Sequence, residues 1–260
     1  MKNKKYIQLQ LITLIIPLFF SCSESTEETR KVINESELPD EKGDLNTYAK
    51  RHIESQLRIS SNEKYELKIY KENLDGDDKQ DAIITVNRLD FAINEAANSA
   101  NPAKRAEIGY MGNFNFFFYY DGAKDLISPP IVIASSPLLP LKISFENISS
   151  ENYKDILIDF RIRNSSFKDF FTVINHTPRR VFEFRNFDGM GTSKSECYSF
   201  KYTTGSYSAF KDIQVMKANL GSVPKNADLN TFEPSINPTS ELLYTFFYVP
   251  QEGKYMTKRK

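Results

Sequence analysis

Apolar and polar residues alternate along most of the chain beyond residue 60. This period of two is typical of half-buried β-strands. The clearest run is DILIDFRIR, in which one face would carry Ile156, Ile158, Phe160 and Ile162 and the other Asp159, Arg161 and Arg163. The other predicted strands are YELKIYKE, DAIITVNR, FNFFFYYDG, KDFFTVIN and TPRRVFEFR, and LLYTFFYV and KYMTKR joined by PQEG predict a C-terminal hairpin.

Two stretches have the helical period instead. Leu45, Ala49, Ile53 and Leu57 recur every four residues, and Asp44 or Asn46 could cap the first turn. The Ala-rich run between Arg88 and Gly109 predicts a helical insertion at a sheet edge. The pattern as a whole predicts a mainly β protein with some α: an antiparallel sheet or sandwich with an N-terminal helix and a helical insertion.

Composition supports a β fold and argues against one class of partner. The 260 residues include 20 Phe and 14 Tyr but no Trp, and aromatic side chains favour strands. FNFFFYY could stack sugars on one face, but burial on both faces is the expected reading. The formal net charge is zero, so we expect no nucleic-acid partner.

The first residues have the features of an export signal. A basic start, MKNKK, precedes the apolar stretch YIQLQLITLIIPLFF, which ends at Ser21-Cys22. This end resembles the lipobox of bacterial lipoproteins, in which a small residue precedes the cysteine that becomes lipidated. The resemblance implies lipidation at Cys22 and anchoring of the chain to a membrane. An ordinary cleaved signal with an incidental cysteine is the alternative.

The predicted organisation follows from this start. Residues 1–21 would be the signal peptide, 22–44 an acidic flexible tether, and 45–260 a β-rich globular domain. The expected location is the bacterial cell envelope, as an outer-membrane lipoprotein that faces the periplasm or the surface. Cys197 is then the remaining thiol, expected to be buried and inert.

The stretch NLDGDDKQDAII is the one candidate for chemistry. Side-chain oxygens at Asn73, Asp75, Asp77 and Asp81, with the backbone carbonyl of Lys79, occupy every second position of a tight loop. Calcium takes six to eight oxygen ligands, so such a loop predicts a calcium site. The alternative is a solvated, Asx-rich turn without a metal.

These residues resemble the D-x-[DN]-G-D-x-x-x-D loops of FG-GAP and VCBS-type repeats, which precede strands in adhesion and bacterial surface proteins. Asn73, Asp75, Gly76, Asp77 and Asp81 match that pattern. An EF-hand would need a glutamate where this chain has Ile84. Asp155 and Asp212 also come directly before apolar strands, which predicts three degenerate loop-strand-hairpin repeats, unless the recurrence is chance.

Catalytic motifs are scarce. The chain has two histidines, His52 and His176, and no G-x-S-x-G, P-loop or G-x-G-x-x-G. His176 is expected at an exposed hairpin turn. The sequence therefore favours a non-catalytic binding or structural module with an unknown protein or glycan ligand. An envelope hydrolase that uses acidic residues is the alternative.

Overall fold

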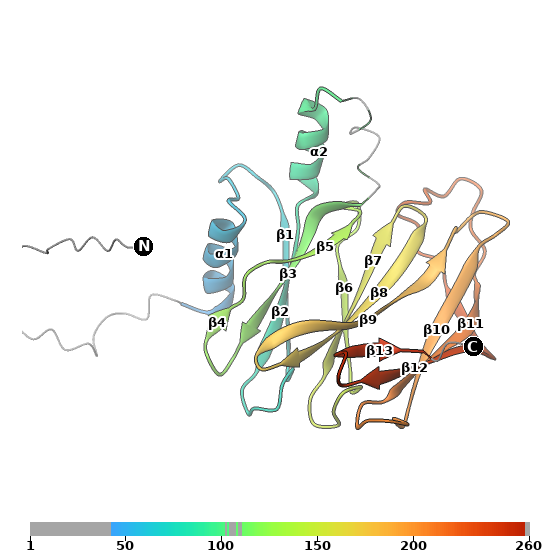
Figure 1. Ribbon diagram of the computed structural model, residues 1–260. Helices are drawn as coiled ribbons and strands as arrows, with labels where there is room; N and C mark the ends of the chain where they lie inside the picture. Colours follow the sequence, from blue (N-terminus) through green and yellow to red (C-terminus); the bar gives the residue numbers. More distant parts are fainter. Residues whose placement is uncertain (1–42, 102, 104–107, 109–110, 258–260) are drawn as a thin grey trace, which may run out of the picture. The chain divides into compact units, whose positions relative to one another are not determined.

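The computed structural model describes residues 43–101, 103, 108 and 111–257 (Figure 1). The predicted signal peptide, Cys22 and the predicted tether up to residue 42 lie outside the described residues. Within the described ranges, neither helix has the length and apolar character needed to cross a membrane.

The described chain is mainly β, and all its strand pairs are antiparallel. The helices are α1 (Leu45–Gln56) and α2 (Leu89–Asn98). The strands are β1 (Glu66–Glu72), β2 (Asp81–Asn87), β3 (Gly112–Asp121), β4 (Leu126–Ile127), β5 (Ile131–Ser135), β6 (Lys142–Glu146), β7 (Asp155–Ile162), β8 (Ser165–Ile174), β9 (Thr177–Asp188), β10 (Glu196–Thr203), β11 (Asp212–Leu220), β12 (Ile236–Val249) and β13 (Lys254–Met256). The predicted fold class is confirmed.

The strands form two sheets with simple connections. In the five-stranded sheet, β1, β2 and β3 are neighbours, and the long β3 pairs with β4 near one end and with β5 along the other part. In the eight-stranded sheet each strand from β6 to β13 pairs with the next one in sequence. Both sheets therefore grow by hairpins, which bring neighbouring segments of the chain together.

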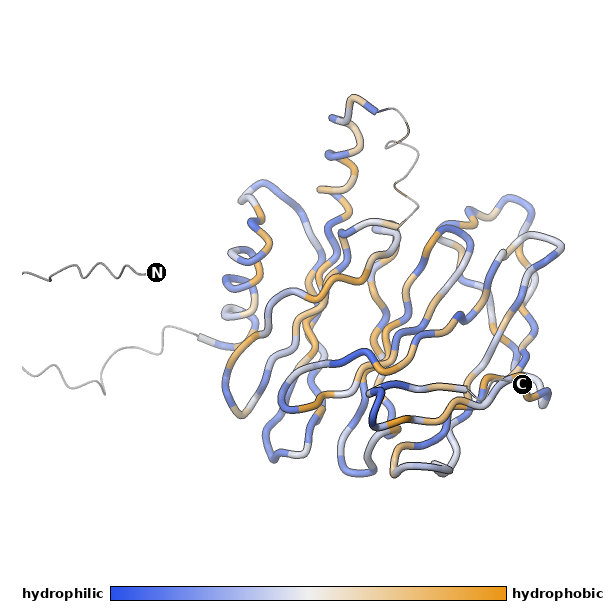
Figure 2. The backbone as a smooth tube through the Cα atoms, viewed as in Figure 1, coloured by the Kyte–Doolittle hydropathy of each residue, from blue (hydrophilic) through white to orange (hydrophobic). Residues whose placement is uncertain are grey.

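Alternation along the central strands divides the core into layers. Ile83 and Phe117 face a cluster shared with Ile156 and Phe171 of the eight-stranded sheet. The intervening residues of β2 and β3 point to the other face and pack against α1. A third cluster joins β7–β9 with β11–β13, so the eight-stranded sheet curls until its last strands cover its middle. Figure 2 shows the apolar residues along the strand centres and the polar residues in many of the connecting loops.

The predicted N-terminal helix is confirmed. Ala49 and Ile53 are buried, and the Asp44 carboxylate accepts the Thr47 N–H at 2.8 Å as N-cap. Phe116 to Tyr119 are buried, so FNFFFYY is core on both faces and not an exposed sugar-stacking surface. α2 lies within the predicted insertion and extends beyond the strand ends (Figure 1).

The face of β7 opposite the apolar one is covered in part. Ile156, Ile158 and Phe160 share the inter-sheet cluster as expected, but Arg161 on the opposite face is also buried. Its guanidinium donates to the carbonyl oxygens of Leu229 and Phe232, in the segment between β11 and β12. A neighbouring segment can cover a polar side chain in this way when backbone carbonyls accept its hydrogen bonds.

A buried ion pair fastens the first elements together. The Arg88 guanidinium, at the end of β2, binds both carboxylate oxygens of Glu63 at 2.6 and 2.7 Å. Arg88 also donates to the Leu57 carbonyl oxygen just after α1 and lies 4.0 Å over the Phe91 ring. This pair therefore connects the segment between α1 and β1 to the start of α2.

Candidate metal site

The predicted metal loop connects β1 to β2 and is closed by Asp81. Both oxygens of the buried Asp81 carboxylate accept backbone N–H groups, from Leu74 at 3.1 Å and from Gly122 at 3.0 Å. Burial raises the pKa of Asp81, and these two hydrogen bonds oppose the rise. A side chain at Gly122 would collide with the Gln80 carbonyl, so the close approach requires glycine.

Asp75 and Asp77 each use one oxygen to shape the loop. Asp75 Oδ1 accepts the Asp77 N–H at 3.0 Å, and Asp77 Oδ1 accepts the Lys79 N–H at 2.7 Å. These are Asx turns, which place successive carboxylates on the inside of the bend. The second oxygen of each carboxylate is left to face other groups.

The two remaining oxygens differ in their partners. Asp75 Oδ2 accepts the Tyr119 hydroxyl at 3.2 Å. Asp77 Oδ2 is buried and has no hydrogen-bond partner among the described residues. Such an orphaned buried acceptor is rare in folded proteins and often marks an ion or water position.

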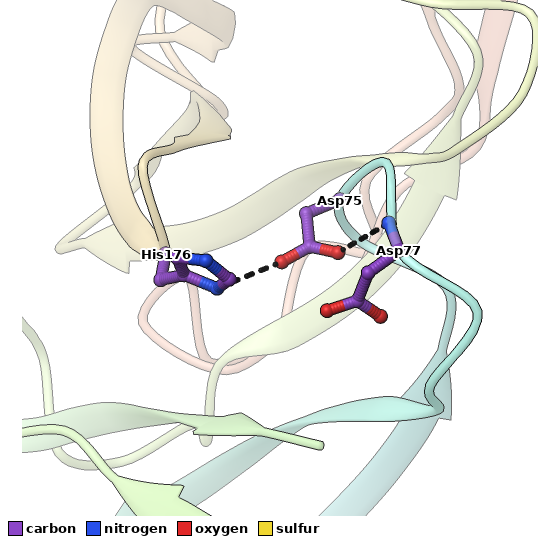
Figure 3. A group of neighbouring side chains, drawn as sticks. All are labelled: Asp75, Asp77 and His176. Carbon is purple, nitrogen blue, oxygen red and sulfur yellow. Dashed lines mark hydrogen bonds and ion pairs between the residues drawn. The ribbon is translucent and has the colours of Figure 1, made fainter. Parts of the chain in front are cut away.

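His176 reaches this loop from the eight-stranded sheet. Asn175 and His176 form the two-residue turn between β8 and β9, with φ of 50° and 59°. Positive φ at both positions is the signature of a type I′ turn, for which Asn is favoured. Figure 3 shows the imidazole directed at Asp75, with the Asp77 carboxylate beside it.

The distances bring three potential ligands together. One ligand atom each from Asp75, Asp77 and His176 lies within 4.8 Å of the others. His176 Nδ1 is 3.4 Å from Asp75 Oδ2 and 3.0 Å from Asp121 Oδ2. This cluster could hold a metal ion.

Asp121 and Tyr119 lie next to the cluster. The buried Asp121 carboxylate is held by the N–H groups of Ala123 and Lys124, and the Lys124 amine lies 3.3 Å from Oδ2. Burial, followed by the charges of Asp81, Asp75 and Asp121, raises the pKa of Tyr119. The Tyr119 hydroxyl therefore stays protonated and donates to Asp75.

The structure divides the predicted ligands into two groups. Asp75 and Asp77 lie together, whereas the Asp81 carboxylate is occupied by the two N–H groups that close the loop. Asn73 and Lys79 are both exposed. The backbone carbonyl oxygen of Asn73 accepts the Lys154 N–H at 2.9 Å. Sequence reasoning missed His176, because a two-residue turn in the sequence does not reveal which loop it will face.

The loops before Asp155 and Asp212 share the construction of the first one. All three connect neighbouring strands over eight residues, 73–80, 147–154 and 204–211, and in each the last residue before the loop pairs with the aspartate. Asp155 accepts the N–H groups of Ile148 and Ser149, and Asp212 accepts that of Ser206. Among the described residues, clustered metal-ligating side chains occur at the first loop alone. Descent from a sequence repeat stays a prediction.

The three loops also contact each other in series. The Lys154 N–H in the second loop donates to Asn73 in the first, and the Lys211 N–H in the third donates to the Ile148 carbonyl oxygen in the second, at 2.8 Å. The first loop is therefore held by its neighbour as well as by Asp81. This support limits its freedom to rearrange and keeps Asp75 and Asp77 in place.

Comparisons with known proteins add nothing to this geometry. The chain matches no family model, no curated protein and no solved structure. The resemblance to FG-GAP and VCBS-type loops therefore rests on the loop residues alone and stays a prediction.

Proposed function

We propose that this protein is a non-catalytic module of the bacterial cell envelope, anchored through lipid at Cys22, in which a divalent cation clips the two sheets together. The observation that carries the proposal is the convergence of Asp75 and Asp77 from the β1–β2 loop with His176 from the β8–β9 turn. An ion at this point would bridge elements that are far apart in sequence. It would also supply a partner for Asp77 Oδ2.

The ligand set bears on the identity of the ion. Calcium, the ion predicted from the loop carboxylates, prefers oxygen ligands throughout. An imidazole nitrogen suits zinc and other first-row ions better. We therefore propose a first-row divalent ion held by Asp75, Asp77 and His176, with calcium held by the loop oxygens as the alternative.

Within the part of the chain that the structure describes, no observation favours the hydrolase alternative. One described cavity is lined by two carboxylates, those of Asp159 and Glu233. Each is already engaged by a lysine side chain, Lys168 at 2.7 Å and Lys142 at 2.5 Å. Both carboxylates are therefore in ion pairs with lysine side chains.

The test is thermal unfolding of the full-length protein in chelator and with added zinc, manganese or calcium. An ion at about 100 times its Kd stabilises a fold by about 2.7 kcal/mol. For a domain of this size that corresponds to a rise in Tm of roughly 5–10 °C. We expect this rise with zinc or manganese.

Three variants locate the ion. Asp77→Asn keeps an oxygen for the Lys79 N–H but removes the charge, and His176→Asn keeps a residue that tolerates the left-handed turn. Both should abolish the rise, while Asp78→Ala, an exposed acidic neighbour outside the cluster, should leave it intact. A calcium response that survives His176→Asn would favour the loop-only site. The metal proposal would be overturned if the ion raised the Tm of all three variants equally, or if no ion raised the Tm of the natural chain.

A further inference from the structure

A separate cavity of about 160 Å³ lies beside β7–β9 and the segment that leads into β12. It shares no lining residue with the metal cluster. Its apolar wall consists of Leu139, Pro140, Phe160, Phe187, Pro234 and Ile236. An engineered apolar cavity of about 150 Å³ in another protein accommodates benzene, so this volume suits a ligand built on one small ring or a short chain.

Arg161 lines this cavity and is nine-tenths buried. Its Nη1 donates to the Phe232 carbonyl oxygen at 2.8 Å, and its Nη2 donates to those of Leu229 and Arg163 at 2.7 and 3.0 Å. The Nε–H is buried and has no acceptor among the described residues. Every acceptor of this guanidinium is therefore a neutral carbonyl, and the Nε–H is unused.

The carboxylates near the cavity do not neutralise Arg161 by contact. Asp159 is bound by the Lys168 amine and by the Asn186 amide, at 2.8 Å in each case, and Glu233 is bound by Lys142. No ion pair of Arg161 occurs within the described part of the chain. Arg161 is thus a buried cation whose direct partners are all uncharged, and a buried charge is costly unless it is paired.

We propose that this cavity binds a small molecule with a single carboxylate on an apolar ring or short chain, and that the carboxylate pairs with Arg161. A guanidinium forms its strongest hydrogen bonds with planar oxyanions. The apolar wall would take the rest of the ligand, as in small-molecule sites that combine hydrophobic lining with a few polar groups. A purely structural Arg161, which only holds the 221–235 segment by its carbonyls, is the competing explanation.

The test uses three probes of one shape on the full-length protein: benzoate, neutral benzamide and cationic benzamidine. Binding is followed by NMR through the resonance of the Arg161 Nε–H. This resonance is assigned as the one that is missing from the spectrum of Arg161→Gln. We expect benzoate to shift this resonance saturably and to bind at least tenfold more tightly than benzamide, the scale of one charge-assisted hydrogen bond. Benzamidine should not compete.

Two variants separate recognition from folding. Arg161→Gln should weaken benzoate binding by roughly tenfold or more. If that variant fails to fold, Leu139→Trp still tests the proposal, because it fills the cavity from its partly exposed wall and leaves Arg161 unchanged. It should block benzoate without lowering Tm. No saturable benzoate shift, equal binding of benzamide, preference for benzamidine, or unchanged benzoate binding in Leu139→Trp would each overturn the proposal.

Discussion

The ion pair between Glu63 and Arg88 allows a quantitative test of what holds the N-terminal elements in place. The side chains are only 8% and 9% exposed, and the contact is bidentate. Glu63→Ala would leave the Arg88 guanidinium buried without its counter-charge. Breaking one partner of such a pair costs about 3–5 kcal/mol.

The expected loss of thermal stability follows from this cost. At about 2–4 °C per kcal/mol for a domain of this size, Tm should fall by roughly 6–20 °C. The remaining contacts of Arg88, to the Leu57 carbonyl and the Phe91 ring, hold the guanidinium in its buried position. Moving it into water would cost the free energy of these contacts. Differential scanning calorimetry with a urea titration would measure both Tm and the free energy of unfolding.

Two controls make the result specific. Glu66 and Lys68 form a surface pair on β1, where the side chains are 44% and 51% exposed, and Glu66→Ala should cost about 0–1 kcal/mol. Replacing both buried partners, Glu63→Leu with Arg88→Met, should recover most of the loss, since no charge is left buried. If Glu63→Ala costs no more than Glu66→Ala, the reasoning from burial is refuted.

The buried aspartates give two more predictions. Burial, opposed by Arg180, raises the pKa of Asp169 to about 7, so the stability that Asp169 contributes is full below the unfolded pKa near 4 and is lost as pH rises through about 7. Tm of Asp169→Asn relative to the natural chain should therefore rise from pH 4 to pH 8, and a difference independent of pH would contradict this. Asp155→Ala, which strands the N–H groups of Ile148 and Ser149, should cost about 2–5 kcal/mol and speed hydrogen exchange at both amides. Asp155→Asn, which keeps one acceptor, should lose less; equal losses would show that the acceptor does not matter.

Much of the local structure could be read from the sequence because it depends on neighbouring residues. The four-residue spacing of Ala49 and Ile53 and the capping aspartate define α1 without any knowledge of its partner. The alternation in DILIDFRIR assigned Ile156, Ile158 and Phe160 to a common apolar face. The loop carboxylates Asp75 and Asp77 were also found in this way, since Asx turns form within a few residues.

Other features were decided by tertiary structure alone. Periodicity placed Arg161 on the face opposite the apolar one but could not show which segment covers that face, and Arg161 is buried under the 221–235 segment. The sequence likewise predicted that His176 sits in a turn, but its approach to Asp75 depends on how the two sheets pack. The sequence by itself thus determined the mainly β fold class, the N-terminal helix and the position of the acidic loop. The envelope address stays a prediction. The packing of the sheets placed the His176 imidazole beside the loop, because contacts between distant segments are set by the shared core and not by local pattern.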